Sequence, residues 1–191
     1  LNDNKISNSI ISRGYKRFSK KLVVVSDGKN ILGNVHNSGD EALLLAKKNK
    51  RNPVVVGNKV DCCNFVSKNF KSKVVIIDDG FQSHYINKNI EIVLVDVSVP
   101  LSDYNLFPVG KLRESLNNIS RANIIIFSKM NFKNKDKNSI INLFLSKINL
   151  DSQAVFYSNI RSRLFLYKNK TLKLYKPSDV SDPVFCVSGI A

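Results

Sequence analysis

Residues 74–79 limit the possible folds of this chain more than any other stretch. Residues 74–77 read Val-Val-Ile-Ile, which predicts a short strand buried on both faces of a parallel sheet. Asp78 and Asp79 follow directly, and Gly80 then permits a sharp turn. Ligands of α/β proteins bind at the carboxyl edge of an open parallel sheet. The run therefore predicts an α/β domain with two carboxylates at that edge.

Apolar runs and amphipathic segments alternate along most of the chain. Short β-branched runs predict strands at residues 9–12, 21–26, 54–56, 90–95, 124–127 and 154–157. Segments with helical spacing predict helices at residues 41–48, 60–70, 112–119 and 139–147. Strands that alternate with helices join into a mostly parallel sheet, because each helix carries the chain back to the same edge. We therefore expect an α/β fold with helices on both faces of one sheet.

The pattern changes near the C-terminus. Residues 163–167 and 171–175 alternate polar and apolar side chains around a Lys-Asn-Lys turn, which predicts an antiparallel hairpin. Residues 184–188 predict another strand. We therefore expect residues 1–160 to form one domain, residues 161–183 a β-hairpin and linker, and residues 184–191 the start of a second domain.

The acidic residues near the predicted sheet edge have a chemical and a structural interpretation. Asp78 and Asp79 are candidate metal ligands, because paired carboxylates hold Mg²⁺ against nucleotide phosphates and Mg²⁺ prefers hard oxygen ligands. The alternative is an acidic turn without chemical function. Asp40 and Glu41 follow a Ser-Gly pair at the start of a predicted helix. Acids in a first helical turn are also ordinary capping residues, so these two alone do not establish a site.

Five short motifs occur in an order that resembles one family. They are Ser-Arg-Gly-Tyr at residues 12–15, Gly-Asp-Glu at 39–41, Asp-Asp-Gly-Phe-Gln at 78–82, Pro-Val-Gly-Lys-Leu-Arg-Glu at 108–114 and Ser-Gly-Ile-Ala at 188–191. Together the motifs resemble the tetraacyldisaccharide 4′-kinases of lipid A synthesis, over essentially the whole chain. The resemblance implies a fold like that of the P-loop NTPases. It also implies transfer of a phosphoryl group from ATP, with Mg²⁺, to the 4′-hydroxyl of a tetraacyldisaccharide 1-phosphate in lipopolysaccharide synthesis.

The chain also differs from the pattern of this family. The family has a glycine-rich phosphate loop ending in Gly-Lys-Thr just before the first motif, and a catalytic histidine beyond the last one. We therefore expect these 191 residues to be the middle of a longer protein and to lack kinase activity alone. A histidine commonly follows the third motif, whereas here Ser83 follows and His84 comes one position later. Val109, Lys111 and Ser115 replace the Ala, Pro and Pro that are usual around the fourth motif.

The resemblance assigns roles to four acids. Asp40 matches the acid/base residue of the family, which would accept the proton of the sugar 4′-hydroxyl. Glu41 would support the metal, and Asp78 and Asp79 would bind Mg²⁺ directly or through water. Phosphoryl transfer needs the charge of the phosphates neutralised and a hydroxyl held in line, and these acids with the metal would meet both needs.

Two arginines and a glutamine complete the expected site. Arg113 would act in catalysis by binding phosphate, because a guanidinium is a rigid fork of donors that stays charged. The structural alternative is a surface pair with Glu114 in the first turn of a helix. Arg13 and Gln82 would bind the nucleotide or the substrate of the enzyme. Gln82 would do so by orienting a water or a substrate oxygen.

The positive charge of the chain limits its partners. The chain carries 30 Lys and Arg against 15 Asp and Glu, a formal net charge of +15. Nucleic acid, an anionic membrane surface or AT-rich codon usage would each explain this charge, and Lys and Asn are spread over every segment, as codon bias produces. No RNP, KH, zinc-finger or helix-turn-helix signature accompanies the charge, so we do not expect nucleic acid as a partner. We expect a lipid A disaccharide precursor and an anionic membrane surface.

Apolar runs and cysteines indicate the compartment. No apolar run approaches the ~20 residues that span a bilayer, and the polar N-terminus shows no signal peptide. Cys62, Cys63 and Cys186 lack CxxC spacing, and His36 and His84 read as exposed loop residues. We expect a cytoplasmic chain, peripheral on the cytoplasmic face of the inner membrane. Two other functional classes stay open: a non-catalytic remnant of the kinase fold, and a basic α/β domain that binds nucleic acid.

Overall fold

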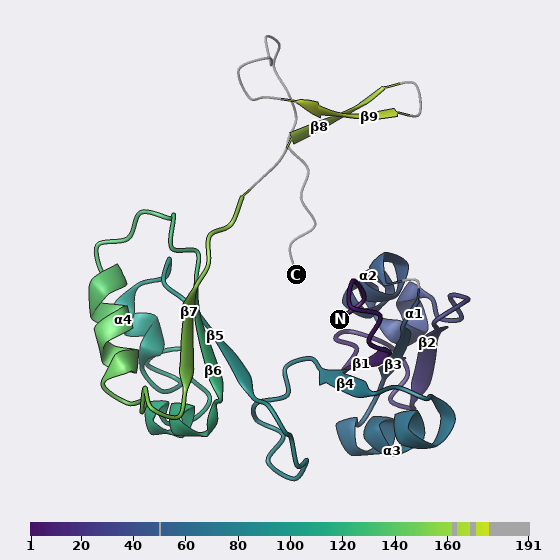
Figure 1. Ribbon diagram of the computed structural model, residues 1–191, viewed down its shortest axis with the longest axis horizontal. Coiled ribbons are helices and arrows are strands. Elements are labelled where there is room, and N and C mark those ends of the chain that lie inside the picture. Colours follow the sequence, from purple (N-terminus) through teal and green to yellow (C-terminus); the bar gives the residue numbers. More distant parts are fainter. Residues whose placement is uncertain (50, 162–163, 169–170, 176–191) are drawn as a thin grey trace. The chain divides into compact units, whose positions relative to one another are not determined.

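The computed structural model describes residues 1–49, 51–161, 164–168 and 171–175. These residues belong to two compact units, Leu1–Glu91 and Ile92–Ala191, and each unit is described by itself (Figure 1).

The first unit contains a four-stranded sheet in the order β2-β3-β1-β4. Its strands are β1 (Asn8–Ser12), β2 (Val23–Asp27), β3 (Pro53–Val56) and β4 (Val74–Ile77). β1 runs parallel to both β3 and β4, whereas β2 pairs antiparallel with β3 at one edge of the sheet. The carboxyl ends of β1, β3 and β4 therefore lie at the same edge, and the two predicted acidic residues follow one of these ends.

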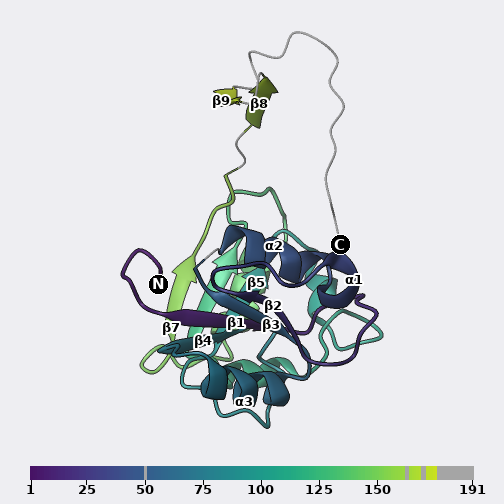
Figure 2. The same ribbon diagram turned by 90° about the vertical axis from the view of Figure 1, so that its right-hand side faces the viewer.

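Helices cover both faces of this sheet, α2 (Asp40–Lys48) on one face and α3 (Lys59–Asn69) on the other (Figure 2). Successive residues of a strand point to opposite faces, so Ile10 of β1 packs in the cluster beneath α2 and Ile11 in the cluster beneath α3. Full burial of one such side chain stabilises the fold by ~1.5–3 kcal/mol, and the clusters therefore hold both helices on the sheet. The helix residues buried in these clusters are Ala42, Ala46, Cys62 and Val66. Both predicted helices are confirmed.

The second unit contains three parallel strands in the order β5-β6-β7. Its elements are β5 (Ile92–Asp96), the 3₁₀ helices η1 (Leu101–Tyr104) and η2 (Leu116–Arg121), β6 (Ile124–Ser128), α4 (Lys137–Leu145) and β7 (Ala154–Tyr157). Phe127 of β6 is fully buried, and its ring lies edge-on to that of Phe144 in α4 with centroids 6.2 Å apart. α4 therefore packs on one face of this sheet (Figure 1).

The predicted hairpin is confirmed. β8 (Leu164–Lys168) pairs antiparallel with β9 (Thr171–Tyr175). The expected linker and the strand expected at residues 184–188 lie outside the described residues, so the domain boundaries at residues 160 and 183 stay predictions. No helix in the described part of the chain has the length and apolar character to cross a membrane.

Three details of the fold differ from the prediction. β4 lies at the edge of its sheet, and Val75 and Ile76 are 39% and 41% exposed rather than buried. The predicted strands that correspond to β5 and β6 do not continue the first sheet but pair with each other in the second unit. The helix expected at residues 112–119 is a 3₁₀ helix that begins only at Leu116.

Candidate functional site

Asp78 follows β4 and is hydrogen-bonded to the neighbouring strand, β1. The N–H of Asp78 donates to the carbonyl oxygen of Ile11 at 2.8 Å, and its Oδ2 accepts a hydrogen bond from Ser12 Oγ at 3.1 Å. Ser12 ends β1 and is 4% exposed, whereas Asp78 is exposed. A buried hydroxyl thus orients an exposed carboxylate at the carboxyl edge of the sheet.

The backbone turns sharply after this first carboxylate. Asp79 has a φ of +48°, in the left-handed region that costs an L-residue roughly 1–2 kcal/mol. The N–H of Ser83 donates to the carbonyl oxygen of Gly80 at 2.9 Å. Lys88 Nζ donates to the carbonyl oxygens of Gly80 and Ser83 at 2.9 and 3.2 Å. The same ammonium pairs with Glu91 at 2.5 Å, so Lys88 helps to hold the turn that presents Asp79.

Lys59 is a residue of this site that sequence analysis did not identify. It is the first residue of α3, is 8% exposed, and its Nζ donates to the carbonyl oxygen of Asp79. Burial lowers the pKa of Lys59, while the charges of Asp79 and Asp78 act to raise this pKa. The charge of Arg13 also lowers the pKa of Lys59. The ammonium therefore lies among three of the predicted site residues.

The sequence carried a signal for Lys59. A cation in the first turn of a helix is unfavourable because it opposes the helix dipole. Asn58 caps α3, its side chain accepting from the N–H of Val60 at 2.9 Å, which puts Lys59 at the first helical position. A lysine at that position, at the carboxyl end of a predicted strand, indicates a compensating partner nearby.

Two glycines bring the chain after β1 against the start of α2. Gly14 and Gly39 have φ values of +69° and +83°. A Cβ at Gly39 would lie 2.7 Å from the carbonyl oxygen of Tyr15, and one at Gly14 would lie 2.9 Å from that of Ser38. Both contacts are closer than a Cβ atom can approach. The Ser-Arg-Gly-Tyr and Gly-Asp-Glu motifs therefore meet in space through their glycines.

Asp40 and Glu41 form the exposed first turn of α2. One oxygen of Asp40, Oδ1, accepts a hydrogen bond from the N–H of Glu41 at 2.9 Å. This bond satisfies one of the N–H groups that are left without a partner at a helix start. Gly39 is the N-cap of α2 and no side chain caps the helix, so this bond is local to Asp40 and Glu41 and the carboxylate remains exposed to a ligand.

The predicted acids do not form a preformed metal cage. Among the residues that the structure describes, no group of three or more His, Cys, Asp or Glu side chains could hold a metal ion, so Glu41 is not gathered with Asp78 and Asp79. Mg²⁺ at a phosphoryl-transfer site needs only one or two carboxylates, because phosphate oxygens and waters complete its six ligands. The exposed oxygens of Asp78 and Asp79 fit that requirement.

The other predicted residues of the first unit lie close to these elements in sequence. Arg13 is exposed directly after β1, and Gln82 is half-buried in the turn after β4. His84 is exposed, as expected. His36 is also exposed, but it lies in the single-turn helix α1 (Val35–Ser38) rather than in a loop.

Arg113 belongs to the second unit. It is exposed and precedes η2, so it is not in the first turn of a helix as the structural alternative assumed. The carboxylate of Glu114 accepts hydrogen bonds from Asn118 at 2.7 Å and from Arg121 at 3.2 Å. The action of Arg113 on phosphate stays a prediction.

The second unit has its own polar cluster at the carboxyl ends of β5 and β6. Asp96 pairs with Lys129 at 2.5 Å and accepts a hydrogen bond from Ser98 Oγ at 2.6 Å. Burial alone would raise the pKa of Asp96, but the hydrogen bonds from Lys129 and Ser98 and the charge of Lys129 lower it below its ordinary value.

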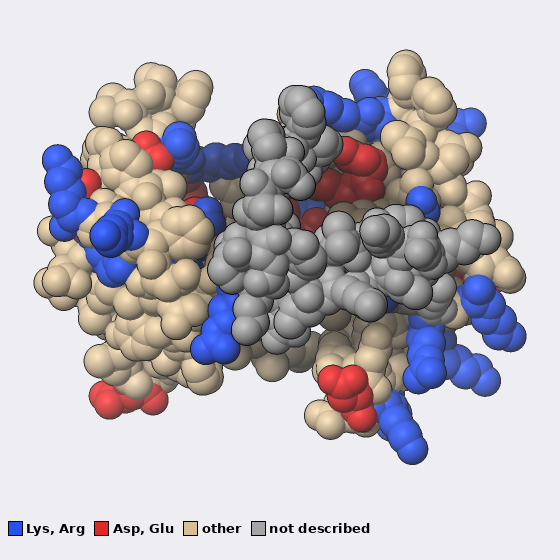
Figure 3. All heavy atoms as spheres, turned by 90° about the horizontal axis from the view of Figure 1, so that it is seen from above, with Lys and Arg blue, Asp and Glu red and all other residues tan. Residues whose placement is uncertain are grey.

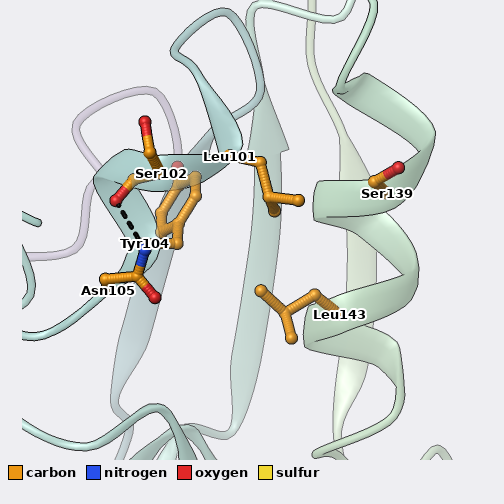
Figure 4. Close-up of a pocket in the computed structure, with 6 residues that line it drawn as sticks. All are labelled: Leu101, Ser102, Tyr104, Asn105, Ser139 and Leu143. Carbon is orange, nitrogen blue, oxygen red and sulfur yellow. Dashed lines mark hydrogen bonds between the residues drawn. The ribbon is translucent and has the colours of Figure 1, made fainter.

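A pocket of about 500 Å³ opens between η1 and α4 in the second unit. Figure 4 shows Leu101 of η1 and Leu143 of α4 on opposite sides of it. The hydroxyl of Tyr104 donates to the carbonyl oxygen of Asp96 at 2.7 Å, and burial raises the pKa of Tyr104 to about 12. The lining residues are Leu101, Ser102, Tyr104, Asn105, Ser139 and Leu143. None of them is charged or predicted as a site residue, so this pocket is not the predicted site.

Parallel strands flanked by helices, with carboxylates and a helix start at the carboxyl edge, define an α/β fold of the kind that binds ligands at the ends of its strands. The fold resembles the solved structure of LpxK from Aquifex aeolicus, which was crystallised in complex with ATP. The TM-score is 0.61 at 22% identity, covering 81% of this chain and 62% of the other.

The chain belongs to the LpxK family of tetraacyldisaccharide-1-P 4′-kinases, because the family model matches residues 1–191. A tetraacyldisaccharide 4′-kinase from Chlorobium phaeovibrioides is 39% identical over 126 residues, covering 64% of this chain and 36% of the relative. One from Halothermothrix orenii is 33% identical over 160 residues, covering 82% of this chain and 41% of the relative. The chain therefore spans less than half the length of these relatives.

Proposed function

We propose that these residues contribute to an enzyme that transfers a phosphoryl group from ATP to the 4′-hydroxyl of a tetraacyldisaccharide 1-phosphate, a lipid A precursor. Family membership supports the reaction class. The observation that carries the proposal is the meeting of three motifs at one sheet edge. Ser12 binds Asp78, and Gly14 and Gly39 bring the first motif against the start of α2.

Asp40 would act as the base. Its carboxylate is exposed at the start of α2, where it would accept the proton of the attacking 4′-hydroxyl as the new bond to phosphorus forms. The close approach of Gly39 to Tyr15 fixes the backbone immediately before Asp40. Positioning of this kind matters because phosphoryl transfer depends on alignment far more than on covalent chemistry by the protein.

Asp78 and Asp79 would hold Mg²⁺, with Glu41 supporting it. When bound, the ion neutralises charge on the phosphates of ATP. Ser12 orients Asp78 through its hydroxyl, and Lys59 and Lys88 hold the turn that carries Asp79.

Arg113, Arg13 and Gln82 would bind the polar groups of the substrates. A guanidinium offers paired donors to phosphate, which suits Arg113 to the transferred group and Arg13 to the nucleotide or the sugar phosphate. Gln82 would orient a water or a substrate oxygen in the turn after β4.

The acceptor is a membrane lipid, so we place the enzyme peripherally on the cytoplasmic face of the inner membrane. The net charge of +15 favours an anionic lipid surface.

The test is phosphorylation of the tetraacyldisaccharide 1-phosphate by a protein of full family length that contains these residues. Asp40→Asn keeps the shape of the side chain but cannot accept a proton, so turnover should fall at least ~100-fold while ATP binding changes little. Asp61→Asn is the control, because Asp61 is an exposed acid in the first turn of α3. Normal turnover in the Asp40 variant would refute the assignment of the base.

The expectation that these 191 residues alone lack activity stays a prediction. Supplying the further family segments covalently or in trans should give activity. Lipid 4′-phosphorylation by the purified chain alone would contradict it.

A further inference from the structure

Two exposed segments next to the candidate site carry large apolar side chains. Residues 15–21 follow the first motif, and residues 31–36 lead through α1 to the second. The exposed fractions are 85% for Phe18, 59% for Tyr15, 58% for Leu32, 54% for Val35 and 42% for Ile31. A group of exposed apolar side chains of this size usually marks an interaction surface.

The charge of the first segment is entirely positive. Residues 15–21 contain four Arg or Lys and no acid. Lys16, Lys20 and Lys21 are exposed. Arg17 instead donates to the carbonyl oxygens of Lys21 and Lys20, at 2.5 and 3.2 Å, and so closes the loop on itself. The exposed lysines are therefore presented by a loop that its own arginine shapes.

Contacts between Phe18 and His36 join the two segments. The N–H of Phe18 donates to the carbonyl oxygen of His36 at 2.9 Å, and the two rings lie 5.6 Å apart. The backbone at Phe18 is therefore fixed although its ring is exposed. We call residues 15–21 and 31–36 the aromatic-basic rim. The rim lies beside the candidate site, because the carbonyl oxygen of Tyr15 abuts the glycine that precedes Asp40.

We propose that the aromatic-basic rim docks this protein onto an anionic lipid bilayer. Aromatic rings favour the boundary between headgroups and acyl chains, and lysines are attracted to anionic lipid headgroups. Charge alone does not select this surface, since Lys and Arg side chains are scattered over both units in Figure 3. The exposed ring of Phe18 among lysines is what selects the aromatic-basic rim. The inference rests on the proposed function in one respect: a kinase of a membrane lipid must meet its acceptor at the bilayer.

A single tryptophan gives a direct test, because the chain contains none. In Phe18→Trp the indole should enter the boundary region when vesicles of phosphatidylglycerol and phosphatidylethanolamine are added, so its emission should shift to the blue and resist acrylamide. Phe132→Trp is the control, because Phe132 is a 45% exposed phenylalanine in the basic segment 131–137 of the second unit. An unshifted emission in Phe18→Trp, or equal shifts in both variants, would overturn the proposal.

Charge-matched triple variants test the lysines. The rim variant is Phe18→Ser with Lys20→Ser and Lys21→Ser, and the control is Phe132→Ser with Lys133→Ser and Lys135→Ser. Both lose one ring and two charges. In vesicle sedimentation, the affinity of the rim variant for the vesicles should fall about 30-fold or more, because two lysines that approach the lipid surface are lost. The affinity of the control should stay within about threefold of the wild type. Equal weakening would mean that net charge alone attracts the protein.

These measurements separate the rim from the proposed reaction. Vesicle binding needs neither ATP nor turnover, so it can succeed in a chain without kinase activity and can fail in an active enzyme. Far-UV circular dichroism of each variant establishes that it is folded. Tighter binding of wild-type chain to a DNA duplex than to anionic vesicles at equal ionic strength would overturn the proposal in favour of a nucleic-acid partner.

Discussion

Replacing Gly39 with alanine probes the contact through which two of the motifs meet. Gly39 has φ +83° and ψ 158°, a backbone region that is essentially restricted to glycine and costs other residues about 1–3 kcal/mol. The added Cβ would also lie 2.7 Å from the carbonyl oxygen of Tyr15. Overpacking of this kind costs a further ~1–3 kcal/mol. We therefore expect Gly39→Ala to lower the free energy of unfolding by about 2–6 kcal/mol.

Urea unfolding followed by far-UV circular dichroism measures this loss. Gly33→Ala is the matched control, because a Cβ there would lie 3.1 Å from Val25 but Gly33 has no left-handed φ. The control carries a packing cost without the backbone cost. Gly39→Ala should therefore lose at least ~1 kcal/mol more than Gly33→Ala. An equal or smaller loss at Gly39 would refute the close approach of the two motifs.

Two further predictions concern Lys59 and Asp96. Lys59→Met removes the donor to the Asp79 carbonyl but also the cost of burying a charge, so the free energy of unfolding in urea should change by less than ~1 kcal/mol. Turnover of the full-length enzyme should fall ~10-fold or more. A loss of several kcal/mol in stability would make Lys59 a structural residue instead. The pKa of Asp96 is lowered in the folded state, so its stabilising effect is present above the ordinary pKa of 3.8 and is lost as pH falls through the lower folded value. Asp96→Asn should therefore flatten the acid limb of a stability-versus-pH profile, and an unchanged limb would contradict this reasoning.

Local sequence patterns predicted most elements of both units. The bounds of β4 agree with the prediction because four consecutive β-branched residues have little choice but an extended backbone. The strand predicted at residues 9–12 is confirmed as β1, in which the adjacent isoleucines at positions 10 and 11 point to opposite sides.

Features that depend on distant contacts could not be predicted. Periodicity does not say which strands pair, so the antiparallel placement of β2 and the division into two sheets were missed. The approach of Gly14 to Ser38 and of Gly39 to Tyr15 likewise joins segments that the sequence analysis treated separately.

The acidic residues of the candidate site were predicted from the sequence, but the residues that hold them in place were not. Asp78 was found because it follows a strand of unmistakable composition. Ser12, which donates to Asp78, and Lys59, which donates to the carbonyl oxygen of Asp79, were missed. A serine at a strand end is common, and an unfavourable lysine at a helix start does not say which group compensates its charge. Their significance comes from the parallel pairing that brings three strand ends to one edge.

The most direct test of the account is the rate of phosphoryl transfer in full-length enzyme carrying Asp78→Ala or Asp79→Ala. Each variant should lower turnover at least ~100-fold, because phosphate charge is then left uncompensated in the transition state. Urea unfolding should change little in either variant, since both side chains are exposed. Turnover near that of the wild type in both variants, with the lipid acceptor and ATP present, would contradict the claim that phosphoryl transfer occurs at this acidic edge.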